Sequence, residues 1–584
     1  MKGIIKKGFT GLLAAAMLAG CGSSASSSAG ASNSASSQSG SETLAADQTL
    51  NMVFTDLSIL DVNDARNANE FQVLTEVQEG LFRTFTDENG IEKIENAGCT
   101  GYDVSDDNLT YTFHLREGSK WSDGVAVTAD NYVDSWKRLL VPDNAFPYAF
   151  LATGIAGAEA FYNGEGSADD IAVSKIDDYT FTATLAAPDA TFIKKVSMLC
   201  FYPIRKDLID AAEASGGNWT NDYSLHVFNG PFVISDRVLE NSMTLTKNDN
   251  YWDKDNVKLQ TVNLKVVNET ATQAQLMESQ QLDVLQLTDL EYVDQWQKYV
   301  DNGTMNHLSI TSPSITYLAF DMQKDGNGGP SGLMYNAKCR KAISLALDRE
   351  EYNALFQNGL AIPAYSVIPN GITVGDTEFR SYQSEELKSD ENTKLAADPA
   401  ALKALFEEGA KEEGHTGNAA DETLTVIAYT PTTLDSNILE WYKQQIEDKI
   451  GCTVKIEVYP DVSTWKTARD SYKYDFYTMG WFGDYNDPET FLQLFTSDSG
   501  YAKFMGGFSN AEYDDLYAKG TASQDPEERI KYFAQAEQVL LDESGVAPLY
   551  FPNDQIYIQS YVKNLSTPTF GADFEFSRAY IVEH

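Results

Sequence analysis

Apolar and polar positions alternate with two different periods along this chain, and these periods predict strands and helices in turn. In YTFHL, Tyr111, Phe113 and Leu115 fall on one face, as in a half-buried strand. Three further runs, separated by turns rich in Asn, Asp, Gly and Pro, also predict strands: PFVISD (231–236), MTLTKN (243–248) and TVNLKVV (261–267).

Two longer segments have helical spacing. The first follows Thr128, a predicted N-cap, and the second ends before Gly451, a predicted C-cap. Their apolar stripes are Tyr132, Trp136, Leu139 and Leu140 in the first and Ile438, Trp441, Tyr442, Ile446 and Ile450 in the second. The next run, CTVKIEVY, predicts a strand with Val454, Ile456 and Val458 in step. Such alternation of helices and strands indicates α/β lobes, whereas residues 376–422 have the composition of solvated helix and loop.

The first twenty residues predict a lipoprotein signal peptide. Lys2, Lys6 and Lys7 precede a short apolar run, residues 8–19. This run has the ~7–15 residues of a signal-peptide core and falls short of the ~20 that a membrane-spanning helix needs. It ends in LAGC, which resembles a bacterial lipobox. The resemblance implies cleavage after residue 20 and lipidation of Cys21; the alternative is an ordinary secretory signal with a chance cysteine.

Residues 21–46 are expected to form the lipidated cysteine and a flexible tether. Nearly all of them are Ser, Ala, Gly or Asn, which offer too little apolar surface to offset the entropy of ordering. No later run is apolar for long enough to span a membrane. Since two or more acyl chains anchor a protein stably, we expect the protein on the extracytoplasmic face of the cell membrane, held by its lipid.

Composition excludes some classes of partner. The chain has 86 acidic and 43 basic residues and a formal net charge of −43, so we expect no nucleic-acid partner, which would need basic patches. Length suggests roughly two to four domains or lobes. The later cysteines match no zinc spacing, and both disulfides and buried thiols stay open: Cys99, Cys200, Cys339 and Cys452.

No motif predicts an enzyme. The five histidines are too scattered for H-E-x-x-H, and no P-loop, G-x-S-x-G elbow or G-x-G-x-x-G is present. The acid-rich KNDNYWDKDNVKL lacks the glycine and glutamate spacing of an EF-hand. Asp484 and Asp487 could form a glycosidase acid pair, but no other sugar-cleaving signature accompanies them. We therefore expect no catalysis, no cofactor and no metal.

Five segments form an ordered set of motifs. They are YTFHLREGSKWSDGVAVTADNYVDSWKRL (111–139), NGPF (229–232), NDNYWDKDNVKL (248–259), CRKAISLALDRE (339–350) and GWFGDYNDPETFL (480–492). In this order, behind a lipobox, they resemble the oligopeptide- and dipeptide-binding proteins of bacterial ABC importers, family 5 of the extracellular solute-binding proteins. The resemblance covers nearly the whole mature chain, although RKAISLALDRE by itself has only the spacing of a buried helix.

The resemblance implies an α/β, two-lobed fold of the periplasmic-binding-protein type (cluster C) with an extra domain. The implied boundaries are 47–78, 202–308 and 553–584 for a discontinuous lobe I, 79–201 for the extra domain and 309–552 for lobe II. Ligand would lie between the lobes, which would close around it by a hinge motion on two crossing strands.

The same resemblance implies the residues of the ligand site. Asp484, the aspartate of the G-W-x-x-D-Y segment, would bind the α-ammonium group of a peptide by a charge-assisted hydrogen bond. Trp481 would wall a side-chain pocket, and Gly483 would contact the ligand from the same loop. The other implied contacts, each of which could instead be a core residue, are Trp465, Tyr148 and Tyr317. Backbone hydrogen bonds would hold the peptide main chain in the manner of an added strand.

The sequence departs from the family pattern where some members bind the carboxylate of the peptide. Thr478 stands where those members have Arg, Asp435 where they have His, and Arg66 where an acid is known. The C-terminal anchor and the length of the ligand therefore stay open, with Arg66 as a candidate replacement anchor.

The function implied by the resemblance is that of a monomeric extracytoplasmic receptor. It would capture oligopeptides and deliver them to the permease subunits of a membrane ABC importer. The alternative is a protein of the same family with another cargo, such as a metal chelate, heme or a sugar, or a sensor of signalling peptides. An anchor for an amino terminus would favour peptides, and its absence would favour another cargo.

Overall fold

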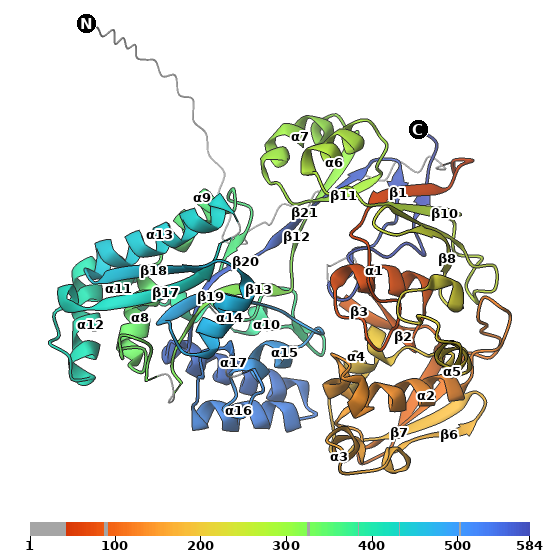
Figure 1. The fold of residues 1–584 in the computed structure, drawn as a ribbon, viewed down its shortest axis with the longest axis horizontal. Helices are drawn as coiled ribbons and strands as arrows, with labels where there is room; N and C mark the ends of the chain where they lie inside the picture. The colour runs from red at the N-terminus through yellow and green to blue at the C-terminus, as the bar shows by residue number, and fades with distance from the viewer. Residues whose placement is uncertain (1–42, 87–91, 324–326, 384, 431, 502–503) are drawn as a thin grey trace, which may run out of the picture. The chain divides into compact units, whose positions relative to one another are not determined.

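The computed structural model describes residues 43–86, 92–323, 327–383, 385–430, 432–501 and 504–584, of which Leu44–His584 form one compact unit. The predicted signal peptide, Cys21 and nearly all of the predicted tether lie outside the described residues. In the described part, helices pack around three β-sheets of four or more strands (Figure 1). The α/β class predicted from the alternating patterns is confirmed.

A seven-stranded sheet forms the part that we call lobe I, with strand order β12-β21-β11-β1-β10-β9-β8. Its strands are β1 (Thr49–Val53), β8 (Phe232–Val238), β9 (Ser242–Lys247), β10 (Thr261–Lys265), β11 (Val284–Leu287), β12 (Met305–Thr311) and β21 (Asn553–Gln559). Its helices are α1 (Ala68–Val77), α5 (Lys206–Ser215), α6 (Thr270–Glu278) and α7 (Glu291–Asp301), and a small ladder joins β22 (Val562–Lys563) and β23 (Tyr580–Ile581). Strands β8, β9 and β10 confirm the three runs predicted between residues 231 and 267.

A four-stranded sheet, β4-β5-β7-β6, forms the extra domain together with a hairpin. The sheet contains β4 (Cys99–Val104), β5 (Thr110–Leu115), β6 (Val173–Asp177) and β7 (Thr180–Thr184); the hairpin is β2 (Phe82–Thr86) with β3 (Glu92–Asn96); the helices are α2 (Ala129–Leu139), α3 (Ala158–Tyr162) and α4 (Phe192–Val196). As predicted, β5 alternates between buried and half-buried positions, and α2 begins after Thr128. Tyr132, Trp136 and Leu139 on α2 are fully buried.

A six-stranded sheet forms lobe II, with strand order β14-β20-β13-β19-β17-β18. Its strands are β13 (Ser314–Phe320), β14 (Ile362–Pro363), β17 (Thr423–Tyr429), β18 (Thr453–Tyr459), β19 (Phe476–Phe482) and β20 (Val546–Phe551), with a separate ladder of β15 (Thr373–Val374) and β16 (Thr377–Glu378). Its helices are α8 (Ala337–Ala346), α9 (Arg349–Phe356), α10 (Phe379–Tyr382), α11 (Asp390–Ala396), α12 (Pro399–Glu412), α13 (Thr433–Ile450), α14 (Val462–Asp470), α15 (Glu489–Leu492), α16 (Ala511–Ala522) and α17 (Pro526–Asp542).

Two expectations for lobe II need correction. Helix α13 and its glycine C-cap are confirmed, since Gly451 has a φ of 85°, but only the first part of the strand that follows is buried. Val458 is 55% exposed because β18 lies at the edge of the sheet. The interpretation of residues 376–422 as solvated was also wrong in part, because α12 buries Leu402 and Phe406 against the core of lobe II.

Two strands cross between the lobes, as the resemblance implied. Strand β12 of lobe I runs directly into β13 of lobe II, and β20 of lobe II runs directly into β21 of lobe I. At the crossing point, the backbone N–H of Ser312 donates to the carbonyl of Pro552 at 2.9 Å. Figure 1 shows β12 and β21 side by side between the two lobes.

Each of the three larger sheets packs against its own main cluster of buried apolar side chains. The predicted domain boundaries themselves stay a prediction. The cysteines of the described chain are buried free thiols: Cys99, Cys200, Cys339 and Cys452. Across the described ranges, no helix combines the length and the apolar character needed to cross a membrane.

Candidate ligand-binding site

A pocket of about 640 Å³ lies where lobe I, the extra domain and lobe II meet. Lobe I contributes α1 and the C-terminal segment 568–577, and the extra domain contributes the β2–β3 hairpin and α4. Lobe II contributes the loop 482–486, which follows β19. The pocket is therefore a cleft between lobes, where the resemblance placed the ligand.

The loop after β19 places Asp484 on the wall of this pocket. The backbone N–H of Gly483 donates to the carbonyl of Pro313 at 2.8 Å, which ties the loop to the crossing segment. A Cβ on Gly483 would lie 2.9 Å from Phe491 and 3.0 Å from Phe570, so a larger residue would displace the loop. The Asp484 N–H donates to Thr490 Oγ1 at 2.9 Å, and this bond fixes the backbone next to α15.

Asp484 forms no ion pair with any side chain that the structure describes. Its Oδ2 accepts one hydrogen bond, from Thr490 Oγ1 at 3.3 Å. Burial raises the pKa of Asp484 to about 6, and the Thr490 hydrogen bond offsets only part of this effect. Because an ionised carboxylate without a partner is costly away from water, this side chain would gain most from a ligand cation.

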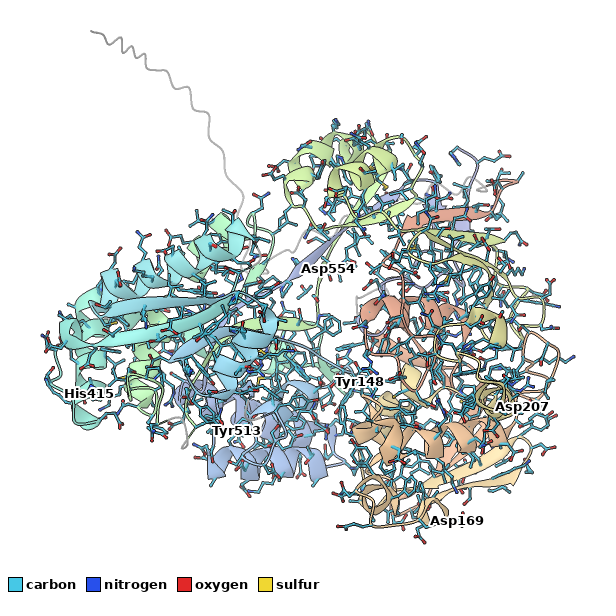
Figure 2. The ribbon with its side chains drawn as sticks, in the orientation of Figure 1. Tyr148, Asp169, Asp207, His415, Tyr513 and Asp554 are labelled. Atoms are coloured by element: carbon cyan, nitrogen blue, oxygen red, sulfur yellow. The ribbon has the colours of Figure 1, made fainter. Side chains whose placement is uncertain are left out.

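Tyr148 is a residue of the extra domain that also lines the pocket. Burial, and then the negative charge of Asp484, raises the pKa of Tyr148 well above its usual value. Its ring contacts the edge of Phe71, with ring centroids 5.8 Å apart. Figure 2 labels Tyr148 at the boundary between the extra domain and lobe II. Its hydroxyl therefore remains neutral and can donate a hydrogen bond close to Asp484.

Arg66 also lines the pocket, but its side chain is 50% exposed and pairs with Asp64. Its position is that of a cation at the rim of the cleft. The two other residues at which the sequence departs from the family lie outside the pocket lining. Thr478 donates its hydroxyl to Tyr442 Oη at 3.2 Å, and Asp435 caps the start of α13.

Three predicted aromatic contacts do not line the pocket in this structure. Trp481 packs edge-on against Tyr501 and Trp465 against Tyr477, with ring centroids 5.1 Å and 5.6 Å apart. Both indole N–H groups are buried without an acceptor among the described residues. Tyr317 is fully buried, because β13 is a central strand with core on both faces, and its hydroxyl donates to Met505 Sδ at 2.6 Å. Ligand contact by these three residues stays a prediction.

The sequence patterns missed a group of buried charges at the floor of the pocket. Glu79 accepts hydrogen bonds from Arg83, from Tyr251 Oη at 2.6 Å and from Trp252 Nε1. Burial raises the pKa of Glu92 to about 7, although the nearby charge of Lys194 lowers it. The NYW sequence in the third motif was the available signal, since Tyr251 and Trp252 hold the Glu79 carboxylate.

Two features of the arrangement bear on chemistry other than binding. Among the described residues, no group of three or more His, Cys, Asp or Glu side chains could hold a metal ion. Asp487 does not line the pocket, and its carboxylate pairs with Arg529 at 2.8 Å. The Asp484–Asp487 pair therefore has one member turned away from the cleft, which argues against the glycosidase interpretation.

Comparisons with known proteins agree with this geometry. The family model described as "Bacterial extracellular solute-binding proteins, family 5 Middle" matches residues 93–503. The dipeptide-binding protein DppE of Bacillus subtilis is 30% identical over 495 residues, covering 85% of this chain and 84% of the relative.

Two solved structures have the same fold. An oligopeptide ABC transporter substrate-binding domain from Bacillus anthracis is 30% identical, with a TM-score of 0.71, and the match covers 93% of this chain and all of that one. Listeria monocytogenes OppA bound to peptide is 27% identical, with a TM-score of 0.70 and coverage of 92% and 100%. The chain belongs to family 5 of the bacterial extracellular solute-binding proteins.

Proposed function

We propose that this protein is a receptor that binds short peptides with a free amino terminus and delivers them to the permease subunits of a membrane ABC importer. The observation that carries the proposal is the carboxylate of Asp484 on the wall of an interlobe pocket, where it accepts a hydrogen bond from Thr490 but forms no ion pair with a described side chain. A peptide ammonium group is a compact cation that a half-buried carboxylate would bind with a charge-assisted hydrogen bond. The names of the dipeptide-binding relative and of the peptide-bound OppA structure support the same cargo.

The pocket also bears on the alternatives. Heme and sugars lack an ammonium group and would leave Asp484 without its counter-ion in a closed cleft. We propose a monomeric binding protein without catalytic activity, with Arg66 as the candidate group for a ligand carboxylate.

A calorimetric titration with trialanine at several pH values tests this function. Binding of the ammonium group lowers the pKa of Asp484 from its value of about 6 in the free protein. Below pH 6, the Asp484 carboxyl group must therefore release a proton before it can pair with the ammonium group. The affinity should be constant near pH 7 and roughly tenfold lower at pH 5. If trialanine does not bind, and a metal chelate, heme or a sugar co-purifies with the protein, the peptide proposal is wrong.

We also propose that Cys21 carries the lipid anchor, because it ends an apolar run of signal-peptide length. Cys21→Ser should prevent lipidation, so the protein should appear in the medium or persist as an uncleaved precursor. Membrane fractionation and electrophoretic mobility measure this outcome. Wild-type retention of the variant on membranes, with unchanged mobility, would contradict the anchor.

A further inference from the structure

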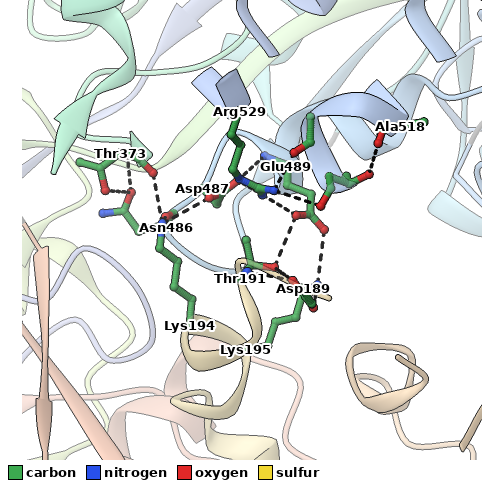
Figure 3. Close-up of polar contacts among 12 residues, drawn as sticks. Asp189, Thr191, Lys194, Lys195, Thr373, Asn486, Asp487, Glu489, Ala518 and Arg529 are labelled. Carbon is green, nitrogen blue, oxygen red and sulfur yellow. Dashed lines mark hydrogen bonds and ion pairs between the residues drawn. The ribbon is translucent and has the colours of Figure 1, made fainter. Parts of the chain in front are cut away.

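We infer that Lys194 is a positioning residue that fastens the Asp484 loop of lobe II to the extra domain and thereby holds the cleft closed. We call the group around it the latch: Lys194 and Lys195 from the extra domain, and Asn486, Asp487, Glu489 and Arg529 from lobe II (Figure 3). The inference rests on the proposed function for the role of Asp484, but the latch itself is defined by contacts within the chain.

Within the described part of the chain, every hydrogen bond and ion pair of the Lys194 ammonium group reaches across to lobe II. It donates to the carbonyl oxygen of Asn486, to the carbonyl oxygen of Thr373 at 3.2 Å and to Asp487 Oδ2 at 3.3 Å. An ammonium group has three protons to donate, so these acceptors satisfy it completely. Opening of the cleft would therefore remove all of these contacts together.

Lys195 has hydrogen-bond partners both in the extra domain and in lobe II. Its ammonium group donates to Asp189 Oδ2 of its own domain at 2.9 Å and to Glu489 Oε1 of lobe II at 3.4 Å. Thr191 adds a second link, because its hydroxyl lies 3.4 Å from Glu489 Oε2. Lys195 thus keeps a hydrogen-bond partner in its own domain when the domains separate, whereas Lys194 keeps there only the longer-range attraction of the Glu92 carboxylate, among the residues described.

Arg529 keeps the lobe II side of the latch in place whether or not the extra domain is near. It donates from Nη2 to Asp487 Oδ1 at 2.8 Å and to Glu489 Oε2 at 2.7 Å. Burial raises the pKa of Asp487, but the charges of Arg529 and Lys194 outweigh burial and hold it below its usual range. Two carboxylates and one guanidinium group of lobe II therefore face the two ammonium groups of the extra domain, which lie near the carboxyl groups of Asp189 and Glu92.

The latch acts on the same loop that carries the proposed ammonium site. Tyr485, the residue after Asp484, is 3% exposed and packs in the apolar core of the extra domain. Lys194 holds the carbonyl of the following residue, Asn486. Because Lys194 lies on α4, whose Phe192 and Val196 are buried in that core, its backbone is rigidly placed. A shift of the extra domain away from lobe II would therefore displace the backbone that directly follows Asp484.

The test uses the mature chain with Cys21→Ser, wild type or Lys194→Met, without ligand and with trialanine as the probe. Small-angle scattering of the unliganded Lys194→Met protein should give a larger radius of gyration than that of wild type. Raising the salt concentration should increase the radius of gyration of wild type more than that of the variant, because salt screens the charge pairing that the variant has already lost. The variant should also release trialanine roughly tenfold faster, since the loss of a buried charged contact acts mainly on dissociation.

Two further variants separate the latch from a general effect of charge or packing. Lys175 lies in the extra domain, and its ion pairs with described residues, Asp130 and Asp178 at 2.7 Å, stay within that domain. Lys175→Met should therefore leave the radius of gyration unchanged. Lys194→Arg retains the positive charge, so its radius of gyration should keep most of the salt dependence of wild type. Equal radii for wild type and Lys194→Met at low and high salt would overturn the latch. If wild type fails to bind trialanine and a non-peptide ligand co-purifies with it, the proposed function is wrong instead, and the scattering of unliganded protein still decides the latch.

Discussion

Asp484→Asn is expected to weaken the binding of a short peptide with a free amino terminus by about 2–5 kcal/mol, mostly through faster dissociation. The substitution keeps the shape of the side chain but leaves the ammonium group of the ligand in a closed pocket without its counter-ion. Calorimetry with trialanine measures the affinity, and stopped-flow fluorescence measures dissociation.

The same contact can be removed from the side of the ligand. N-acetylation of trialanine deletes the ammonium group, so it should weaken binding strongly to wild type and much less to Asp484→Asn, because both changes delete one interaction. Asp376→Asn is the matched control: Asp376 also lines the pocket, but its side chain is 94% exposed and pairs with Lys93. Equal costs of acetylation in wild type and Asp484→Asn would show that Asp484 is not the ammonium site.

Unfolding of the unliganded protein gives an independent check on Asp484. Its pKa of about 6 in the folded chain lies above the ordinary value of about 3.9, so its ionised form destabilises the folded state. This penalty is full above pH 6 and disappears below pH 4, where the group is protonated in both states. Asp484→Asn should therefore raise the free energy of unfolding at pH 7, by about 1–2 kcal/mol. A turn or cap role for Asp484 would instead make the variant less stable.

Arg529→Met should lower the free energy of unfolding by about 3–5 kcal/mol, the cost of leaving buried charges without their partner. The Arg529 side chain is 2% exposed and is the cation within lobe II that pairs with both Asp487 and Glu489. Methionine can replace much of its volume but none of its charge. Denaturation by urea, followed by circular dichroism, measures the loss.

Arg578→Met is the matched control for Arg529. Arg578 pairs with Glu95 at 2.6 Å, but its side chain is 45% exposed, and exposed pairs contribute only about 0–1 kcal/mol. If Arg529→Met lowers the free energy of unfolding by no more than Arg578→Met does, the buried ion pairs of Arg529 are not important for stability. The loss of stability in Arg529→Met should also be smaller at acidic pH. Protonation of Asp487 there removes the negative charge that the substitution leaves without its partner.

The elements with a strong local period could be predicted from the sequence. Residues 111–115 alternate because one face of β5 is buried, and the stripe that begins at Tyr132 marks the buried face of α2. Burial of Tyr317 could not be predicted in this way, since its neighbours in the sequence do not show that β13 is a central strand.

The charged contacts of the site could not be predicted from local sequence patterns either. Asp484 was found by resemblance to family motifs, and its raised pKa depends on burial that only the fold creates. Lys194 lies nearly 300 positions before Asp487 in the chain, and nothing in the short helix α4 indicates an acceptor at that distance. Contacts between lobes depend on how the sheets are placed, which the period of a single element does not encode.

The order of strands in lobe I has a consequence for synthesis. Strand β21, near the C-terminus, lies between β11 and β12 and pairs with both. Until the last part of the chain has been made, each of those two strands has an unpaired edge, which is a site for pairing with other chains. The seven-stranded sheet can therefore form only after nearly the whole polypeptide has been synthesised. A chain that ends before residue 553 should leave lobe I incomplete and prone to aggregate, even with every residue of lobe II present.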